Sequence, residues 1–132
     1  MNCMIAPIPE ATEIIATKVI NAAYKVHKTL GPGLLESVYE TCLCHELSKC
    51  GLPWIRQLPV DIIYDEIQIE GGLRIDIMVA DSLIVELKAV EEMKPLFEAQ
   101  LLTYLKLTGK RLGLLINFNS ALLKQGLKRM VL

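Results

Sequence analysis

Two adjacent segments in the middle of the chain decide the fold: Leu73-Arg74-Ile75-Asp76-Ile77-Met78-Val79 and, after Ala80-Asp81-Ser82, Leu83-Ile84-Val85-Glu86-Leu87-Lys88. The odd-numbered positions are apolar in both segments, which predicts two strands that each bury one face. A three-residue connection pairs Val79 with Leu83, and this register places Asp76 opposite Glu86. A two-residue loop would put the two carboxylates on opposite faces, which the hydrophobic alternation excludes.

The same register places Arg74 opposite Lys88 on the polar face. Two carboxylates with Cβ atoms about 5 Å apart repel each other unless a proton or a cation lies between them. Mg²⁺ suits this position because it uses one or two carboxylates and completes its coordination with waters and phosphates. Lys88 would then orient or deprotonate a water, or stabilise negative charge on a phosphate. The competing interpretation is a solvated face with diagonal ion pairs, Arg74 to Glu86 and Asp76 to Lys88.

The rest of the chain supplies helices around these strands. Hydrophobic periodicity predicts the following elements: helices over about 9–30, 34–49 and 95–108, strands over 54–64, 67–79, 83–90 and 112–118, a helical turn over 120–125 and a last edge strand over 128–132. Pro59 makes the first strand irregular or an edge strand, and Gly71-Gly72 predicts a bulge. The order α-α-β-β-β-α-β predicts an α/β domain with a mixed sheet and helices on its faces.

One carboxylate of the second helix faces the predicted sheet. At about 100° per residue, Glu36 lies at the edge of the apolar stripe and Tyr39 nearer its centre. Glu46 lies closer still to the middle of the stripe. Position on the helix therefore does not single out Glu36 as a ligand.

The third helix adds an amide. Gln100 lies between Phe97 and Tyr104 on the face predicted to be buried, where an unpaired amide would be costly, so it needs a polar partner. Five polar residues that converge on one pocket are harder to explain by a purely structural role than any one of them alone. The converging residues are Glu36, Asp76, Glu86, Lys88 and Gln100.

Two further polar residues are ranked lower. His27, near the end of the first helix, is a candidate phosphate contact or supporting donor, but a histidine satisfied by backbone carbonyls is preferred. Arg74 binds a scissile phosphate or neutralises Glu86, and the sequence favours neither.

Composition fits a single domain spanning residues 1–132. The chain has a net charge of -1 and no apolar run that approaches the roughly 18 residues of a membrane span. No secretory signal is visible at the N-terminus, so we expect a cytoplasmic protein. The four cysteines lack the usual spacing of a zinc site and are expected to be free thiols in a reducing compartment. They are Cys3, Cys42, Cys44 and Cys50.

The net charge hides an uneven distribution. Residues 61–99 carry ten acidic and three basic side chains, whereas residues 100–132 carry six basic and no acidic ones. A phosphate backbone could lie along this last basic third, and dimerisation would double it. The apolar segment Met130-Val131-Leu132 could extend a sheet across a homodimer.

Three motifs resemble known family signatures. Gly33-Leu-Leu-Glu36-Ser-Val-Tyr39 resembles the signature of the GxxExxY protein family. Asp76 followed by Glu86-Leu-Lys88 is similar to the core motif of the PD-(D/E)XK nuclease superfamily, although Ile75 stands where the motif has proline. Gln100-Leu-Leu-Thr-Tyr104 resembles the QxxxY motif of its exonuclease branches. The resemblance spans about residues 19–118.

The resemblance implies a restriction-endonuclease-like core with a central four-stranded mixed sheet flanked by helices. It also implies a nuclease site dependent on Mg²⁺ or Mn²⁺, with Asp76 and Glu86 as metal ligands and Lys88 acting on the attacking water. Glu36 would complete the site. Gln100, Tyr104, Tyr39, Arg74 and His27 would support the site or the substrate. The implied substrate is DNA or RNA, and the alternative is a catalytically silent nucleic-acid-binding or protein-interaction module that keeps the fold.

Overall fold

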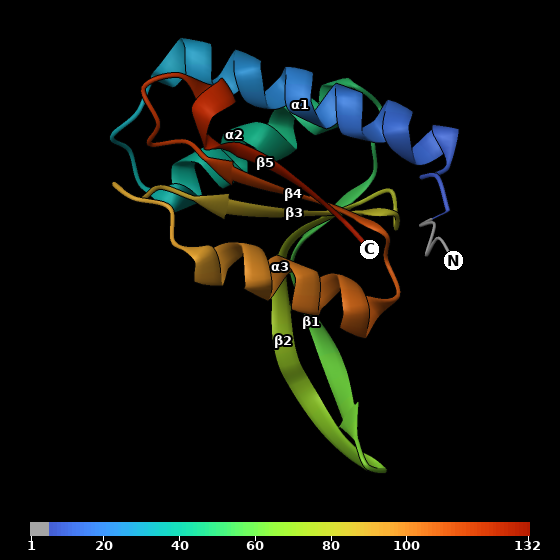
Figure 1. Cartoon of the computed structure of the whole chain (residues 1–132). Helices are drawn as coiled ribbons and strands as arrows, with labels where there is room; N and C mark the ends of the chain where they lie inside the picture. Colours follow the sequence, from blue (N-terminus) through green and yellow to red (C-terminus); the bar gives the residue numbers. More distant parts are fainter. Residues whose placement is uncertain (1–5) are drawn as a thin grey trace, which may run out of the picture.

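The computed structural model of the protein describes residues 6–132, and Cys3 lies outside them. The chain forms two helices, three strands, a third helix and two further strands separated by a short 3₁₀ helix (Figure 1). Their bounds are α1 (Glu10–Leu30), α2 (Glu36–Lys49), β1 (Trp54–Tyr64), β2 (Ile67–Val79), β3 (Leu83–Lys88), α3 (Pro95–Thr108), β4 (Leu112–Asn117), η1 (Leu123–Gly126) and β5 (Leu127–Val131). The predicted α/β class is confirmed.

The sheet has five strands in the order β1-β2-β3-β4-β5. The first three strands form an antiparallel meander, β4 runs parallel to β3, and β5 pairs antiparallel with β4. The expected count of four strands in the sheet is therefore wrong. The final segment, predicted as an edge strand, joins the same sheet and becomes its fifth member.

Helices cover both faces of the sheet, and each face has its own core. The core under α1 and α2 contains Val19, Tyr39 and Leu43 together with residues of β3 and β4. The core under α3 contains Leu101 and Leu105. Gly113 of β4 allows α3 to pack closely, because it has no side chain. An added Cβ at this position would lie 2.8 Å from Leu101 Cδ1. Figure 1 shows α1 and α2 on one side of the sheet and α3 on the other.

β2 changes faces along its length. Ile77 and Val79 belong to the core under α1 and α2, whereas Leu73 and Ile75 belong to the core under α3. The expectation that these four odd positions share one face is therefore wrong. The change occurs at Asp76, where the neighbouring strand β1 also departs from regular geometry.

The irregularity in β1 lies at Gln57. The register pairs Arg56 with Ile77 and Leu58 with Ile75, so Gln57 is the residue across from Asp76, yet the two are not paired in the ladder. Gln57 has a φ of 51°, a left-handed conformation that is uncommon for a residue other than glycine. Both strands therefore turn over at the same level of the sheet.

The outer part of the β1–β2 hairpin projects past α3 (Figure 1). We call residues 61–70 the arm. The register of β1 against β2 shifts between Val60 and Ile62. The predicted bulge at Gly71-Gly72 lies opposite this shift on β2, and Gly71 has a φ of 58°. Asp61 holds this bulge because its carboxylate accepts a hydrogen bond from the Gly71 N–H at 2.9 Å.

Two further features of residues 6–132 concern the helices and the cysteines. No helix of residues 6–132 combines the length and apolar character that crossing a bilayer requires. Cys42, Cys44 and Cys50 are free thiols, as predicted. Burial raises the pKa of the Cys44 thiol to about 11, so this side chain is not a reactive nucleophile.

Candidate active site

The two central carboxylates meet where β2 and β3 separate. The loop pairs Val79 with Leu83 as predicted, but the ladder ends at Ile77 and Val85. Asp76 and Glu86 are therefore adjacent without being a ladder pair.

Hydrogen bonds from the backbone hold each carboxylate in the gap left by the ladder. Asp76 Oδ2 accepts a hydrogen bond from the Leu87 N–H at 2.8 Å, and Glu86 Oε1 accepts one from the Asp76 N–H at 3.4 Å. Each side chain thus binds the opposite strand. The widening of the sheet leaves both carboxylates where strand pairing would otherwise continue.

Glu86 is the more deeply buried acid of the pair. It is 6% exposed, and burial raises its pKa to about 9, helped by the side chain of Asp76 and opposed by the charge of Lys88. A carboxyl group in this position needs a proton or a cation to be stable at neutral pH. The sequence predicts repulsion by Asp76, and the structure adds burial as the larger cause.

Lys88 ends β3 next to this pair. Its backbone carbonyl accepts a hydrogen bond from the Phe118 N–H at 2.9 Å, and its Nζ lies 4.4 Å from the centre of the Phe97 ring. The ammonium lowers the pKa of both Glu86 and Glu36, which places it within electrostatic reach of both. The aromatic face holds the cation beside the carboxylates without neutralising it.

Glu36 is the first residue of α2 and is exposed. Desolvation of its carboxyl group is the main cause that raises its pKa. The negative charge of Asp76 adds to this rise, and the positive charge of Lys88 opposes it. Residues 6–132 contain no group of three or more His, Cys, Asp or Glu side chains close enough to hold a metal ion. Glu36 therefore interacts with Asp76 through its charge, and the structure does not gather it with Asp76 and Glu86 into a three-ligand cluster.

Tyr39 fixes the loop that leads into α2. Its hydroxyl donates a hydrogen bond to the Gly31 carbonyl at 2.6 Å and accepts one from the Leu34 N–H at 3.1 Å. Its ring stacks on Phe118 with a centroid distance of 4.7 Å. Tyr39 thus supports the site by holding the backbone before Glu36, and its own side chain is fully buried.

The third helix presents a different residue to the carboxylates from the one expected. Gln100 is exposed, so its predicted position on the buried face is wrong. The predicted polar partner exists, because Gln100 Nε2 donates to Tyr104 Oη at 2.9 Å. The pKa of the Tyr104 hydroxyl is raised mainly by partial burial. The negative charges of Glu86 and Asp76 raise it further. Tyr104 therefore lies within electrostatic reach of the pair, and Gln100 holds its hydroxyl.

Arg74 and His27 are not drawn into the centre. Arg74 is exposed, and within residues 6–132 no ion pair joins it to Glu86 or joins Asp76 to Lys88. The predicted ladder of diagonal ion pairs is therefore absent from this part of the chain, because β2 turns over between positions 75 and 77. His27 Nε2–H donates to a backbone carbonyl at 2.8 Å, as preferred, but the carbonyl belongs to Ser120.

Sequence reasoning missed a buried polar network beside Asp76. Glu40 is 6% exposed and accepts hydrogen bonds from Arg56 Nη2 at 2.8 Å and Gln57 Nε2 at 2.7 Å. Gln57 Nε2 also lies 3.5 Å from Asp76 Oδ1. The available signal was the spacing of Glu36 and Glu40, which places both carboxylates on the same side of α2.

Asn117 is the second residue missed. It is 3% exposed, its Oδ1 accepts a hydrogen bond from the Val90 N–H at 3.1 Å, and its Nδ2 donates to the Val90 carbonyl at 3.0 Å. This side chain continues the β3–β4 pairing beyond Lys88. It also explains why β3 ends at Lys88 although a strand was expected to reach Val90.

The comparison with protein families agrees with this geometry. The family model of the PD-(D/E)XK nuclease superfamily matches residues 13–130. The chain belongs to the PD-(D/E)XK nuclease superfamily. Searches of curated proteins and of solved structures gave no match. The narrower likeness to the GxxExxY family stays a prediction.

The residues of this superfamily member fit a hard divalent cation. Asp76 and Glu86 offer carboxylate oxygens side by side, and burial raises the pKa of Glu86, so a bound cation would favour its ionised form. Two carboxylates suffice for Mg²⁺, which keeps waters in its other positions. Members of the superfamily generally use divalent metal ions, so the donor set and the family point the same way.

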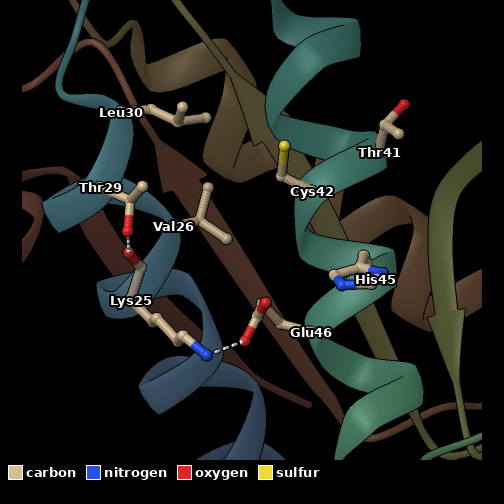
Figure 2. A pocket seen from close by; sticks show the side chains of 8 residues that line it. All are labelled: Lys25, Val26, Thr29, Leu30, Thr41, Cys42, His45 and Glu46. Carbon is tan, nitrogen blue, oxygen red and sulfur yellow. Dashed lines mark hydrogen bonds and ion pairs between the residues drawn. The ribbon is translucent and has the colours of Figure 1, made fainter.

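A separate groove lies between the first two helices of the nuclease-superfamily fold. It has a volume of about 330 Å³, and Figure 2 shows Val26, Leu30 and Cys42 around it, with Lys25 Nζ bonded to Glu46 Oε1 at 2.8 Å. Its lining includes neither of the paired carboxylates. The candidate active site is therefore the open end of the β2–β3 pair.

Proposed function

We propose that this superfamily member is a nuclease that depends on Mg²⁺ or Mn²⁺ and hydrolyses phosphodiester bonds of DNA or RNA. The observation that carries the proposal is the buried Glu86 beside Asp76, with Lys88 next to both. A divalent cation held by these carboxylates would polarise the scissile phosphate and lower the pKa of a water. The three residues supply the metal-binding and cationic groups that phosphodiester hydrolysis uses.

The other side chains have supporting roles in this proposal. The Lys88 ammonium, held against Phe97, stabilises the negative charge that develops on the phosphate. Tyr104 approaches from α3, and Glu36 from the N-terminus of α2 binds or orients solvent. Neither of these two residues has to bind the cation directly.

The basic third of the chain offers only part of the expected phosphate-binding surface. Lys110 pairs with Asp81 at 3.1 Å, Arg129 pairs with Glu13 at 2.6 Å, and Arg111 donates to backbone carbonyls. Three basic side chains of this region make no ion pair within residues 6–132: Lys106, Lys124 and Lys128. We expect weak, salt-sensitive binding of nucleic acid with specificity set at the site.

The test is a cleavage assay on single-stranded, double-stranded and branched DNA and RNA with Mg²⁺, Mn²⁺ or EDTA. We expect cleavage with either metal, none in EDTA, and loss in Asp76→Ala and Lys88→Ala while circular dichroism shows an intact fold. Asp65→Ala, which removes an exposed carboxylate from the arm, is the matched control and should cleave normally. Absence of cleavage on every substrate with both metals would overturn the proposal.

Metal binding is tested separately by calorimetric titration with Mn²⁺. We expect binding that disappears in Asp76→Ala and Glu86→Gln. Nucleic-acid binding without cleavage and without such a metal site would instead identify the silent module that the sequence also allows. The free thiols fit a reducing compartment such as the cytoplasm, where we expect the protein to act.

A further inference from the structure

The arm carries an apolar face whose outer part is exposed within residues 6–132. The register pairs Ile62 with Ile69 and Tyr64 with Ile67, so these four side chains share one face of the hairpin. Ile69 is 44%, Ile67 60% and Tyr64 70% exposed. A two-stranded hairpin is marginally stable in water by itself, and a contiguous apolar face of this kind indicates an interaction surface.

This face continues the core under α3. Leu58, Val60 and Ile62 pack against that core, and the arm extends the same side of the sheet beyond the part that α3 covers (Figure 1). At the base of the arm, this face of the sheet is therefore covered by a helix, α3. The surface that suits the outer part is a second amphipathic helix laid on the sheet.

The charge of the arm restricts what can bind there. It carries four acidic and no basic side chains: Asp61, Asp65, Glu66 and Glu70. Phosphate backbones would be repelled, which excludes the nucleic-acid substrate as the occupant. Two arms packed together would bring eight carboxylates into one interface, so arm-to-arm pairing is disfavoured as well. The occupant is a helix with apolar and basic side chains.

The outer face of α3 has this chemistry. Leu96, Leu102 and Leu107 are exposed on it, and Lys106 is exposed among them without an ion pair in the described part of the chain. Residues 94–111 carry four basic side chains and one acidic one. The chain thus holds both an acidic apolar sheet face and a basic apolar helix face.

We propose that the chain forms a reciprocal homodimer in which the apolar face of each arm docks on the outer face of α3 of the other copy. A two-fold axis makes the two contacts identical, so every arm and every α3 is covered and the assembly closes. Apolar burial provides the affinity, while the opposite charges set the orientation and exclude arm-to-arm contact. The dimer does not require metal or substrate.

The test is a charge swap followed by sedimentation velocity over a series of protein concentrations in EDTA. The arm variant is Asp65→Lys with Glu66→Lys, and the helix variant is Thr103→Glu with Lys106→Glu. We expect each variant alone to dimerise at least about tenfold more weakly than wild type. An equimolar mixture should recover dimer, because the reversed arm meets the reversed helix and the unchanged arm meets the unchanged helix.

Lys124→Glu on η1 changes the same charge elsewhere and should leave dimerisation unchanged. Circular dichroism confirms that the variants, all at exposed positions, stay folded. A monomeric wild type would overturn the proposal. A dimer that resists both charge reversals but dissociates in Lys128→Glu would overturn it too, because the interface would then lie at the β5 edge. Both results are independent of cleavage activity, so failure here leaves the proposed nuclease function standing.

Discussion

Replacing Glu86 with glutamine should stabilise the metal-free protein. The pKa of this carboxyl rises from 4.5 to about 9 on folding, mainly because it is buried. At pH 7 the unfolded chain is ionised at this position while the folded protein keeps the proton, so folding has to take up a proton about 2.5 pH units above the unfolded pKa. At about 1.4 kcal/mol per pH unit this disfavours folding by roughly 3 kcal/mol.

The sign of this contribution fixes its pH dependence. A raised folded pKa means that the favourable contribution of protonated Glu86 is complete below about pH 4.5 and is lost as the pH rises toward 9. Glutamine is neutral at every pH, so its contribution to the free energy of unfolding does not change over this range. The free energy of unfolding of Glu86→Gln should therefore equal that of wild type near pH 4 and exceed it progressively at higher pH.

Urea unfolding in EDTA at several pH values measures this difference, with Glu70→Gln on the arm as an exposed control that should show none. Saturating Mg²⁺ should reverse the order, because a ligand at about 1,000 times its dissociation constant adds about 4.1 kcal/mol to the wild type and less to the variant. A stability difference independent of pH would refute the electrostatic reasoning. Equal stabilisation of both proteins by Mg²⁺ would refute the assignment of Glu86 as a ligand.

Three further substitutions test how the site is supported. Tyr39→Phe removes the hydroxyl that holds the loop before α2 and should lower the free energy of unfolding by about 1–2 kcal/mol in urea titrations; an unchanged midpoint would contradict this role. Asn117→Ala leaves both backbone groups of Val90 without their partner and should cost about 3 kcal/mol, with faster amide hydrogen exchange at Val90 as the local readout. Gly113→Ala forces a methyl group against Leu101 and should cost about 1–3 kcal/mol by thermal unfolding, whereas a stability equal to wild type would show that α3 can move away.

Alternation of residue types predicted the strands but not the side that each strand faces. Apolar residues continue at 73, 75, 77 and 79, and this pattern is the same whether the strand stays flat or turns over. The ambiguity arises because both faces of the sheet are buried, as Met78 and Ile84 show on the α3 side. The turn itself depends on the positive φ of Gln57, a residue type that gives no local signal for that conformation.

The error at Gln100 has a related origin. The spacing of Phe97, Leu101, Tyr104 and Leu105 predicts the apolar stripe of the third helix, but only Leu101 and Leu105 are fully buried. Moving the centre of the stripe carries Gln100 out to solvent and leaves Tyr104 at the boundary. The carboxylate pair, in contrast, was predictable because the short loop fixes the register between β2 and β3.

The turn of β2 at Asp76 has a consequence for the chemistry. If β2 kept the same side chains on each face along its whole length, a carboxylate at this position would lie under one helical layer only. Here the boundary between the two cores passes through Asp76, and the charges show that groups from both layers reach it. Asp76 raises the pKa of Glu36, which comes from α2, and that of Tyr104, which comes from α3. The irregularity that sequence patterns did not predict therefore puts Asp76 within electrostatic reach of residues on both faces of the sheet.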